Sequence, residues 1–481
     1  MTGQRVTQIE AHGIDTIPDA ERTGTTRELF ALWVGSNVLF SNLLLGGLLI
    51  ALGLPLVTAV VLAVAGNVAW ILVGLLATVG PKNGTATMVV SRAQYGYHGT
   101  KISCAFNWLV MIGYEGIAFS IAAMGTFSLA DYLGFGLNTF AKTVVLLALI
   151  VVAFAIALFG RNLLFLVQKV AAVPLGVATV MFAAFLIPHV HWDYTPAATL
   201  HGWPLTATVL IGVSIVLSVP LAYTAPADVA RYLPRGTSSR AVALATAVGG
   251  YVPTVALMVV GILAATAVDP SDFTTSMRQV LPGWFYPVFL LIVVVGTLAN
   301  SIGAIYSAGL TLQTMGVRMS RPKTVWVDGT IGTAIAAYGV LVASNFLTVL
   351  QNFLLWSIFW AAPFFGIFIA ELIASRGNYD AAALHQRSGT YWYGNGMRWR
   401  AVAALALGMT CSALFGNTPY LKGPLSSELL HGGDLSAVSG LLISGTAYWA
   451  LCVLPARRSR TETPANDGVP VASTSAEGAG A

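Results

Sequence analysis

Polar residues interrupt two of the long apolar stretches of the chain, and such interruptions can bind a ligand. The first stretch, which begins near residue 28, carries Gly35, Ser36 and Asn37, and the sixth carries Pro220. Gly weakens a helix and Pro removes a backbone hydrogen bond. A helix broken inside a bilayer exposes free N–H and C=O groups that can hold a polar molecule or a cation. We therefore expect Asn37 and Pro220 to mark gating breaks, the alternative being simple kinks or packing contacts.

Two further apolar stretches carry polar side chains at mid-depth. Tyr114 and Glu115 lie in the third stretch, and Asn300 and Ser301 lie in the eighth. A lone carboxyl group at this depth is costly unless it is paired, protonated or facing water. We interpret Glu115 as a proton carrier or as an acceptor for substrate N–H groups. The alternative is a protonated side chain that bonds to a neighbouring helix.

The composition shows which elements must position these residues. Of 481 residues, 56% are hydrophobic and 9% are charged, whereas soluble domains carry about 25% charged residues. Many apolar runs reach the ~20 residues of a membrane-spanning helix and do not alternate as barrel strands do. The sequence predicts an all-α integral membrane protein with about 12 transmembrane helices. The predicted spans are 28–52, 55–79, 103–131, 140–159, 166–188, 205–227, 241–267, 283–315, 325–343, 347–375, 400–416 and 436–455.

The basic residues are distributed unevenly between the two sides of these spans. All but three of the 24 Lys and Arg residues fall in the N-terminus, in alternate loops or in the tail, and the exceptions are Lys142, Arg278 and Lys422. This asymmetry follows the positive-inside rule and predicts that both termini are cytoplasmic. We expect a multi-pass protein of the plasma membrane, whose partners are the lipid bilayer and a small molecule rather than nucleic acid.

The two interrupted helices divide the chain into segments. If residues 28–188 and 205–375 form two five-helix repeats, the breaks fall in the first helix of each repeat, and the second repeat is inverted in the membrane. Two more helices occupy 400–455. Residues 1–27 form a cytoplasmic N-terminal lead, and 456–481 are rich in Pro, Thr, Ser, Gly and Ala, which predicts a disordered cytoplasmic tail.

Motifs for catalysis are missing from the sequence. It contains no Walker loop, nucleophile elbow, H-E-x-x-H or dinucleotide fingerprint. Its cysteines, Cys104, Cys411 and Cys452, have no metal-binding spacing. We therefore expect neither an enzyme nor a bound metal or cofactor, apart from a coupling ion.

Five segments carry a family resemblance. They are IEAHGIDTIPDAERTGTTRELFALWVGSN near the N-terminus, SRAQYGYHGT, PADVARYLPRGTSSR, ANSIGAIYSAGLTLQTMG and YDAAALHQRSGTYWYGNGMRWRA. In these the chain resembles the nucleobase:cation symporter family, in its purine–cytosine permease (cytosine permease-like) branch. The resemblance implies a five-plus-five inverted-repeat fold of the leucine-transporter type with two extra C-terminal helices. It also implies import of a nucleobase or related small heterocycle by cation symport with alternating access.

The resemblance further implies how the base is held, between two aromatic rings. Tyr114 falls at the first ring position, but Val219, which is not aromatic, falls at the second. Met111 falls where a Gln can bond the base in cytosine-type relatives, and Glu115 can supply the acceptor that Met111 lacks. Ser218 and Ser301 match polar residues that contact the base. The substrate-binding residues expected are Tyr114, Glu115, Ser218, Val219, Asn300 and Ser301.

The ion site implied by the resemblance is also altered. In sodium-coupled relatives the cation rests on oxygens of helices one and eight. The matching cation-binding positions are Gly35, Val38, Gly296, Ala299 and Asn300. Ala299 lacks the usual hydroxyl, which weakens a sodium site, so that proton coupling through Glu115 is favoured slightly. Both H+ and Na+ stay open.

The altered contacts leave several substrates open. A purine, a substituted pyrimidine and a pyrimidine vitamin precursor are comparable candidates for the substrate. The alternative function is import of another small solute, such as a nucleoside, a hydantoin or an amino acid, on the same fold. A remote alternative is a non-transporting membrane receptor. We expect a monomer.

Overall fold

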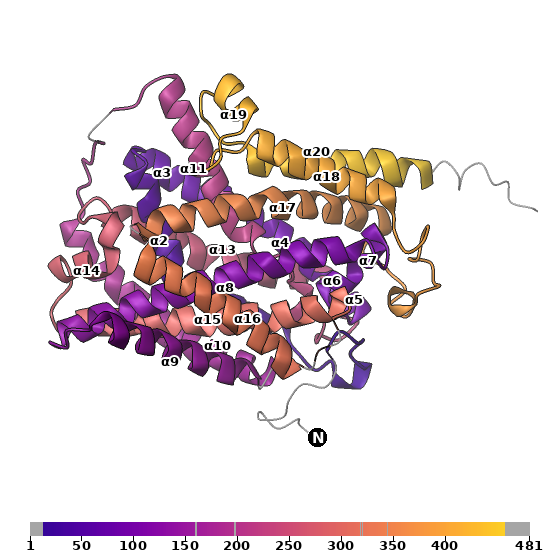
Figure 1. The fold of residues 1–481 in the computed structure, drawn as a ribbon, viewed down its shortest axis with the longest axis horizontal. Coiled ribbons are helices and arrows are strands. Elements are labelled where there is room, and N and C mark those ends of the chain that lie inside the picture. Colours follow the sequence, from indigo (N-terminus) through magenta and orange to yellow (C-terminus); the bar gives the residue numbers. More distant parts are fainter. Residues whose placement is uncertain are drawn as a thin grey trace, which may run out of the picture.

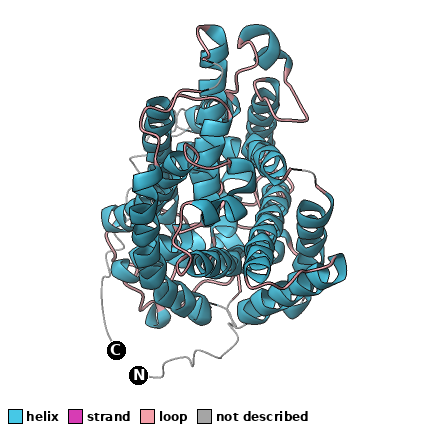
Figure 2. Ribbon diagram, turned by 90° about the vertical axis from the view of Figure 1, so that its left-hand side faces the viewer, coloured by secondary structure: helices cyan, strands magenta, loops and turns pink. Residues whose placement is uncertain are grey.

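The described part of the chain is built from helices. The computed structural model describes residues 13–158, 161–196, 199–317, 319, 321–343 and 345–456. Within these ranges the only β-type pairings are two isolated bridges, and Figure 2 shows helices joined by loops. The predictions for the first 12 residues of the lead and for tail residues 457–481 lie outside the described residues.

In the described part of the chain, seven continuous helical stretches are long and apolar enough to cross a membrane. They are Leu56–Asn83, which comprises α3 (Leu56–Gly66), α4 (Trp70–Ala77) and α5 (Val79–Asn83), then α8 (Thr100–Tyr132), α11 (Trp203–Leu221), α13 (Ser239–Ala264), α15 (Tyr286–Met315), α17 (Phe346–Ser375) and Ser436–Ala456, which begins with α20 (Ser436–Tyr448).

The remaining spans are shorter or bent. Four shorter apolar helices are described. They lie within α9 (Thr139–Leu158), α10 (Arg161–Leu186) with its 3-10 extension Ile187–His189, α16 (Arg321–Ala337) with its π-helical extension Tyr338–Val342, and α18 (Trp399–Leu414). The bent pair is α1 (Thr26–Asn37) and α2 (Phe40–Ala51). Seven spans, four shorter helices and one bent pair account for the twelve predicted spans, and the predicted fold class is confirmed.

The first span breaks directly after Asn37, as predicted. Its two halves, α1 and α2, are separated by Val38 and Leu39 and are bent by 52°. The carbonyl oxygen freed at Asn37 accepts hydrogen bonds from the Leu39 N–H and from the Asn42 side-chain amide, both at 2.9 Å. Because water cannot satisfy backbone groups at this depth, these internal bonds make the break tolerable in lipid.

The sixth span also breaks where a proline was expected to interrupt it. Helix α11 ends at Leu221, one residue after Pro220, and the short helix α12 (Ala227–Ala230) follows five residues later. The hydroxyl of Thr224 in the unwound segment bonds to the side chain of Asn107 on α8. A neighbouring helix therefore provides a partner for the polar side chain of the unwound segment.

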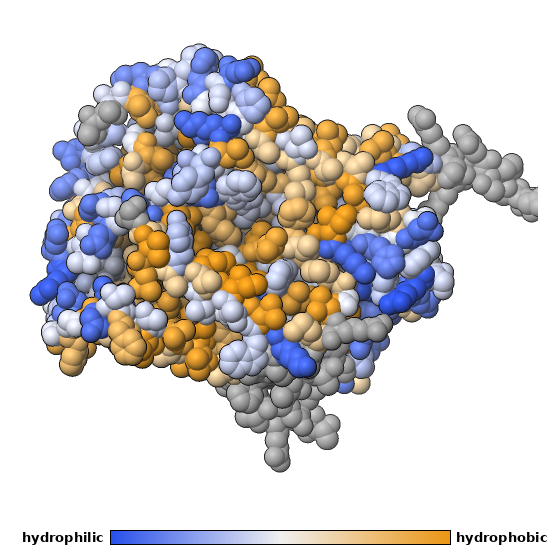
Figure 3. Space-filling model, viewed as in Figure 1, coloured by the Kyte–Doolittle hydropathy of each residue, from blue (hydrophilic) through white to orange (hydrophobic). Residues whose placement is uncertain are grey.

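The long helices run side by side in Figure 1. Helices α8 and α15 pack along their lengths, α16 lies against α8, and α18 and α20 pack on α17 at one edge. On the face seen in Figure 3, hydrophobic residues form a band across the middle and hydrophilic ones gather towards the left and right ends. Large apolar side chains such as Val57, Val173 and Trp326 are more than 70% exposed, as expected of lipid-facing positions.

The described part of the N-terminal lead packs against one end of the bundle. The Ile17 N–H donates to the Gly84 carbonyl at 2.9 Å, and the Gly24 N–H donates to the Tyr232 carbonyl at 3.0 Å. Arg231, which follows α12, donates to the Gly13 carbonyl at 2.7 Å. The lead is therefore bonded to the residues that directly follow the second and the sixth span.

Candidate substrate site

A cavity of about 150 Å³ lies where the two broken helices meet α8, α15 and α17. The first span, including its break, provides Leu32, Trp33, Ser36, Leu39, Ser41, Asn42 and Leu45, and α8 provides Met111, Tyr114, Ile117, Ala118 and Ile121. The end of α11 and the segment after it provide Val219, Ala222, Tyr223, Ala225 and Val229. Helix α15 provides Thr297, Asn300, Gly303, Ala304 and Ser307, and α17 provides Leu350 and Leu354. The lining is largely apolar, with a few polar groups, as is typical of small-molecule sites.

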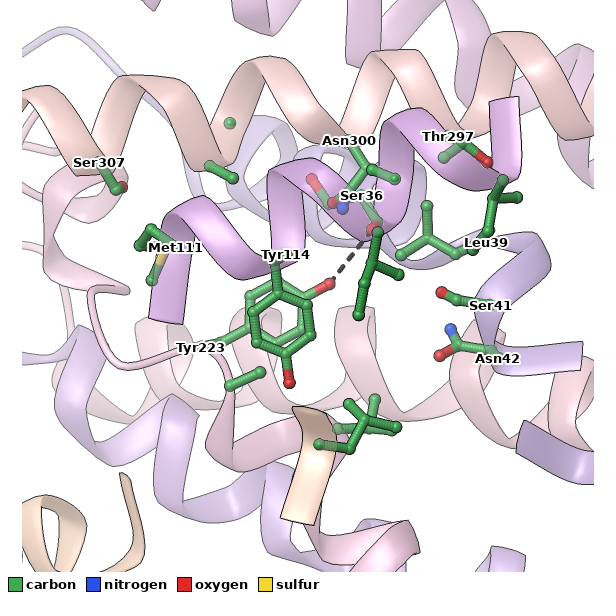
Figure 4. Close-up of a pocket in the computed structure, with 18 of the residues that line it drawn as sticks. Ser36, Leu39, Ser41, Asn42, Met111, Tyr114, Tyr223, Thr297, Asn300 and Ser307 are labelled. Carbon is green, nitrogen blue, oxygen red and sulfur yellow. Dashed lines mark hydrogen bonds between the residues drawn. The ribbon is translucent and has the colours of Figure 1, made fainter. Parts of the chain in front are cut away.

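Two tyrosine rings project into this cavity (Figure 4). The ring of Tyr114 meets Phe353 of α17 edge-on, with centroids 4.8 Å apart. The ring of Tyr223 packs against Trp70 and Trp33, with centroid distances of 4.9 and 5.4 Å. Both rings are held by other aromatic side chains, so they offer preset apolar surfaces to a flat ligand.

The polar groups of the cavity come from the first span and from α15. Figure 4 shows Ser36, Ser41 and Asn42 on the first span, and Thr297 and Asn300 on α15. The hydroxyl of Thr297 is buried and has no hydrogen-bond partner among the described residues. Buried polar groups are normally bonded, so this hydroxyl is available to a bound molecule.

Three of the six predicted substrate residues line the cavity. They are Tyr114, Val219 and Asn300. Each has a chain neighbour that was also predicted to touch the substrate but lies outside the lining. Successive residues of an α-helix point about 100° apart, because 3.6 residues complete a turn. One member of each predicted pair therefore faces the cavity and the other does not.

The three residues outside the lining are Glu115, Ser218 and Ser301. The Ser218 hydroxyl donates to the Ile215 carbonyl at 2.6 Å, and the Ser301 hydroxyl donates to the Leu298 carbonyl at 2.8 Å. Both serines thus bond within their own helices. Glu115 is completely buried and faces α16. The structure gives these three side chains other surroundings than the cavity.

The predicted cation-binding positions are only partly brought together. A Cβ atom added at Gly296 would lie 3.2 Å from the carbonyl oxygen of Val38, so the break of the first span touches α15 there. Asn300, one turn further along α15, lines the cavity. Gly35 and Ala299 are buried outside the cavity lining.

Tyr223 was missed by the sequence reasoning, although its spacing could have indicated it. It lies four residues after Val219, and residues four apart share one face of a helix. Val219 and Tyr223 both line the cavity, Val219 from the last turn of α11 and Tyr223 from just beyond its end.

Comparison with known proteins identifies the family of the chain. Residues 16–435 match a family model described as permease for cytosine/purines, uracil, thiamine, allantoin. A protein of Bacillus subtilis (strain 168) that carries the name purine-cytosine permease YxlA is 28% identical over 463 residues, which cover 92% of this chain and 96% of that protein. The purine-cytosine permease fcyB of Emericella nidulans is 26% identical over 477 residues, covering 93% of this chain and 88% of fcyB.

Two solved proteins share the fold. Mhp1, a nucleobase-cation-symport-1 family transporter solved in a closed conformation with bromovinylhydantoin bound, gives a TM-score of 0.71 at 16% identity over 95% of this chain and 96% of its own. A Na+-coupled sialic acid symporter gives 0.57 at 12% identity over 90% and 91%. The first likeness confirms the leucine-transporter-type fold, while the repeat bounds 28–188 and 205–375 stay a prediction. Because residues 16–435 match the family model, the chain belongs to the permease family for cytosine and purines, uracil, thiamine and allantoin.

Proposed function

We propose that this permease imports a nucleobase-like heterocycle across the plasma membrane by cation symport with alternating access. The observation that carries the proposal is the pair of tyrosine rings, Tyr114 and Tyr223, in a cavity between two broken helices. Family membership supports a permease, and the names of the relatives support a purine or cytosine as substrate. The excess of basic residues in alternate loops supports cytoplasmic termini.

The geometry suits a flat polar ring. Stacking on an aromatic side chain is worth about 1–3 kcal/mol per base and tolerates different bases, because every base has a π-face. The edge of a base carries N–H donors and ring-nitrogen or carbonyl acceptors. The amide of Asn300 offers both a donor and an acceptor, and the unbonded hydroxyl of Thr297 offers another pair. The two rings provide affinity, and the two polar side chains select the edge.

A binding and uptake experiment tests the proposal. The purified protein is heated with adenine, cytosine, uracil, a hydantoin, a nucleoside, a pyrimidine vitamin or an amino-acid mixture, since a ligand of the folded state raises the melting temperature. Uptake of the ligand that stabilises the protein is then measured in proteoliposomes. We expect one or more bases to stabilise the protein and to accumulate. Stabilisation without accumulation would favour a receptor, and stabilisation by an amino acid alone would refute the substrate class.

The variant Tyr114→Leu tests the site. Removing one stacking surface should weaken base binding by about 1–3 kcal/mol, which is about 5- to 150-fold in Kd. Tyr338→Leu is the matched control, because the Tyr338 side chain is 51% exposed on the outer surface and is not part of the cavity lining. Equal base affinity in the wild type and in Tyr114→Leu would contradict the proposed site.

A further inference from the structure

Two acidic side chains, Glu115 and Asp328, are buried along the contact between α8 and α16, outside the substrate cavity. Glu115 of α8 and Asp328 of α16 are both fully buried, and neither belongs to the cavity lining. One turn after Asp328 on the same helix lies Gly332, where an added Cβ atom would lie 3.8 Å from Glu115 Oε2. The Glu115 carboxyl group therefore lies against α16 at the level of Gly332.

Most of the carboxyl oxygens in this pair are unbonded. Asp328 Oδ1 accepts a hydrogen bond of 2.7 Å from the indole Nε1 of Trp108 on α8. Asp328 Oδ2 and both oxygens of Glu115 are buried without a hydrogen-bond partner among the described residues. Within the same residues neither carboxyl group forms an ion pair with Lys, Arg or His. The pair is thus buried without a compensating cation.

The surroundings of Glu115 are otherwise apolar. Asp328 is the titratable group that acts on Glu115 electrostatically. Ile335 packs on Gly116, and Phe119, one turn after Glu115, lies near Gly332. A carboxylate in such a place loses its hydration and meets a second negative charge, and both effects disfavour ionisation. Binding of a proton removes one of the two negative charges from these apolar surroundings.

A metal ion is a poorer occupant of this place than a proton. Hard cations take six or more oxygen ligands, and the pair offers two carboxyl groups in an apolar setting. The described residues hold no group of three or more His, Cys, Asp or Glu side chains that could bind a metal. A proton needs no further ligands and can be held by a single carboxyl oxygen.

We propose that Glu115 and Asp328 form a proton-binding site that takes up the proton co-transported with the substrate. This rests on the proposed function, because co-transport needs a substrate. One proton binds to the pair on the side of higher proton concentration and leaves it on the other side. Glu115 directly follows Tyr114 on α8, so a change in the contact between α8 and α16 is transmitted to the ring that lines the cavity.

The test uses Glu115→Gln and Asp328→Asn, which keep the shapes of the side chains but cannot bind the proton. Asp131→Asn is the matched control, because it removes an acid from the exposed outer end of the same helix. Adenine uptake and adenine-dependent proton uptake are recorded in proteoliposomes that contain a pH-sensitive dye. Infrared spectra of the purified proteins at neutral pH report the carbonyl stretch of a protonated carboxyl group in the absence of substrate.

In the wild type and Asp131→Asn we expect adenine to drive proton uptake and the spectrum to show a buried protonated carboxyl group. In Glu115→Gln and Asp328→Asn adenine-dependent proton uptake falls to the level of empty vesicles. Adenine exchange across the membrane without a gradient should stay within about threefold of the wild type, because the cavity lining is unchanged. Trp108→Phe, which removes the donor to Asp328, should shift the pH midpoint of uptake without abolishing it.

Other outcomes separate this inference from the proposed function. Adenine uptake that needs sodium and moves no protons would overturn the proton site and leave the import of a base standing. Proton uptake that persists in both variants would overturn it as well. If the wild type binds none of the bases, the proposed function fails, and loss of the infrared band in Glu115→Gln and Asp328→Asn still decides whether the pair binds a proton. A wild-type spectrum without a protonated carboxyl group at neutral pH overturns the site.

Discussion

Replacing Tyr223 by Leu tests whether the base stacks on the ring of Tyr223, which lies just beyond the end of α11. The ring of Tyr223 lines the cavity and packs on Trp70 and Trp33. Leucine keeps apolar contact with these indoles but offers no π-face to a base. The lost stacking of about 1–3 kcal/mol predicts a Kd for the base that is about 5- to 150-fold higher than in the wild type.

Two control variants separate stacking from other contributions. Tyr223→Phe keeps the ring and removes only the hydroxyl group, which donates a long hydrogen bond of 3.4 Å to the Ser36 carbonyl. A long, neutral hydrogen bond contributes at the low end of the usual range, about 0.5 kcal/mol, so the Kd should change by less than about threefold. Val219→Ala trims the residue at the family's second ring position and should likewise change the Kd by less than about threefold.

Calorimetric titration of each purified variant with adenine, or with whichever base stabilises the wild type, measures these Kd values. Melting temperatures without ligand show whether the Tyr223→Leu variant is folded. Base affinity that is unchanged in Tyr223→Leu would refute a stacking role for Tyr223. A loss in Val219→Ala as large as in Tyr223→Leu would place the second contact surface at Val219 instead.

Two further predictions concern the packing of the bundle. In Gly261→Ala the added methyl group would collide with the Leu43 carbonyl oxygen where α13 crosses α2, and overpacking of this kind should cost about 1–3 kcal/mol of stability. Thermal unfolding measures this cost, and the control is Gly176→Ala, where nothing lies within 4 Å of the added atom and stability should not fall. In Tyr448→Phe the hydrogen bond of 2.6 Å to the Glu371 carboxylate is lost, which should lower the free energy of unfolding by about 1.5–3 kcal/mol, and an unchanged unfolding curve would contradict this role.

The sequence was sufficient to locate the helices and their breaks, because those features depend on local properties. Apolar runs of bilayer length define the spans, and a proline or a polar cluster within a run disfavours a continuous helix at that place. The break after Asn37 and the end of α11 beside Pro220 follow from this. The first helix begins at Thr26, earlier than expected, because Thr25 and Glu28 form a reciprocal capping box.

Only half of the predicted substrate residues line the cavity, because a residue lines it only if its face of the helix is turned towards the cavity. Tyr114 and Glu115 are adjacent in sequence and both polar, so a linear reading assigns both to the substrate. In the structure they point to different partners, the cavity and α16. Asp328 was not among the predicted site residues for the same reason, since only the packing of α16 on α8 places it at the contact between these helices.

The placement of the two sites on α8 has a physical consequence for coupling. Two ligands influence each other's affinity only if each binds one conformation of a shared element more tightly than another. Helix α8 contributes Tyr114 to the cavity and Glu115 to the contact with α16, so any movement of α8 alters both sites. If protonation favours the conformation that holds the base, then by linkage the base favours protonation by the same factor. A single rigid helix with two functional faces can therefore couple the binding of a proton to the binding of a substrate, although the proton and the substrate never touch each other.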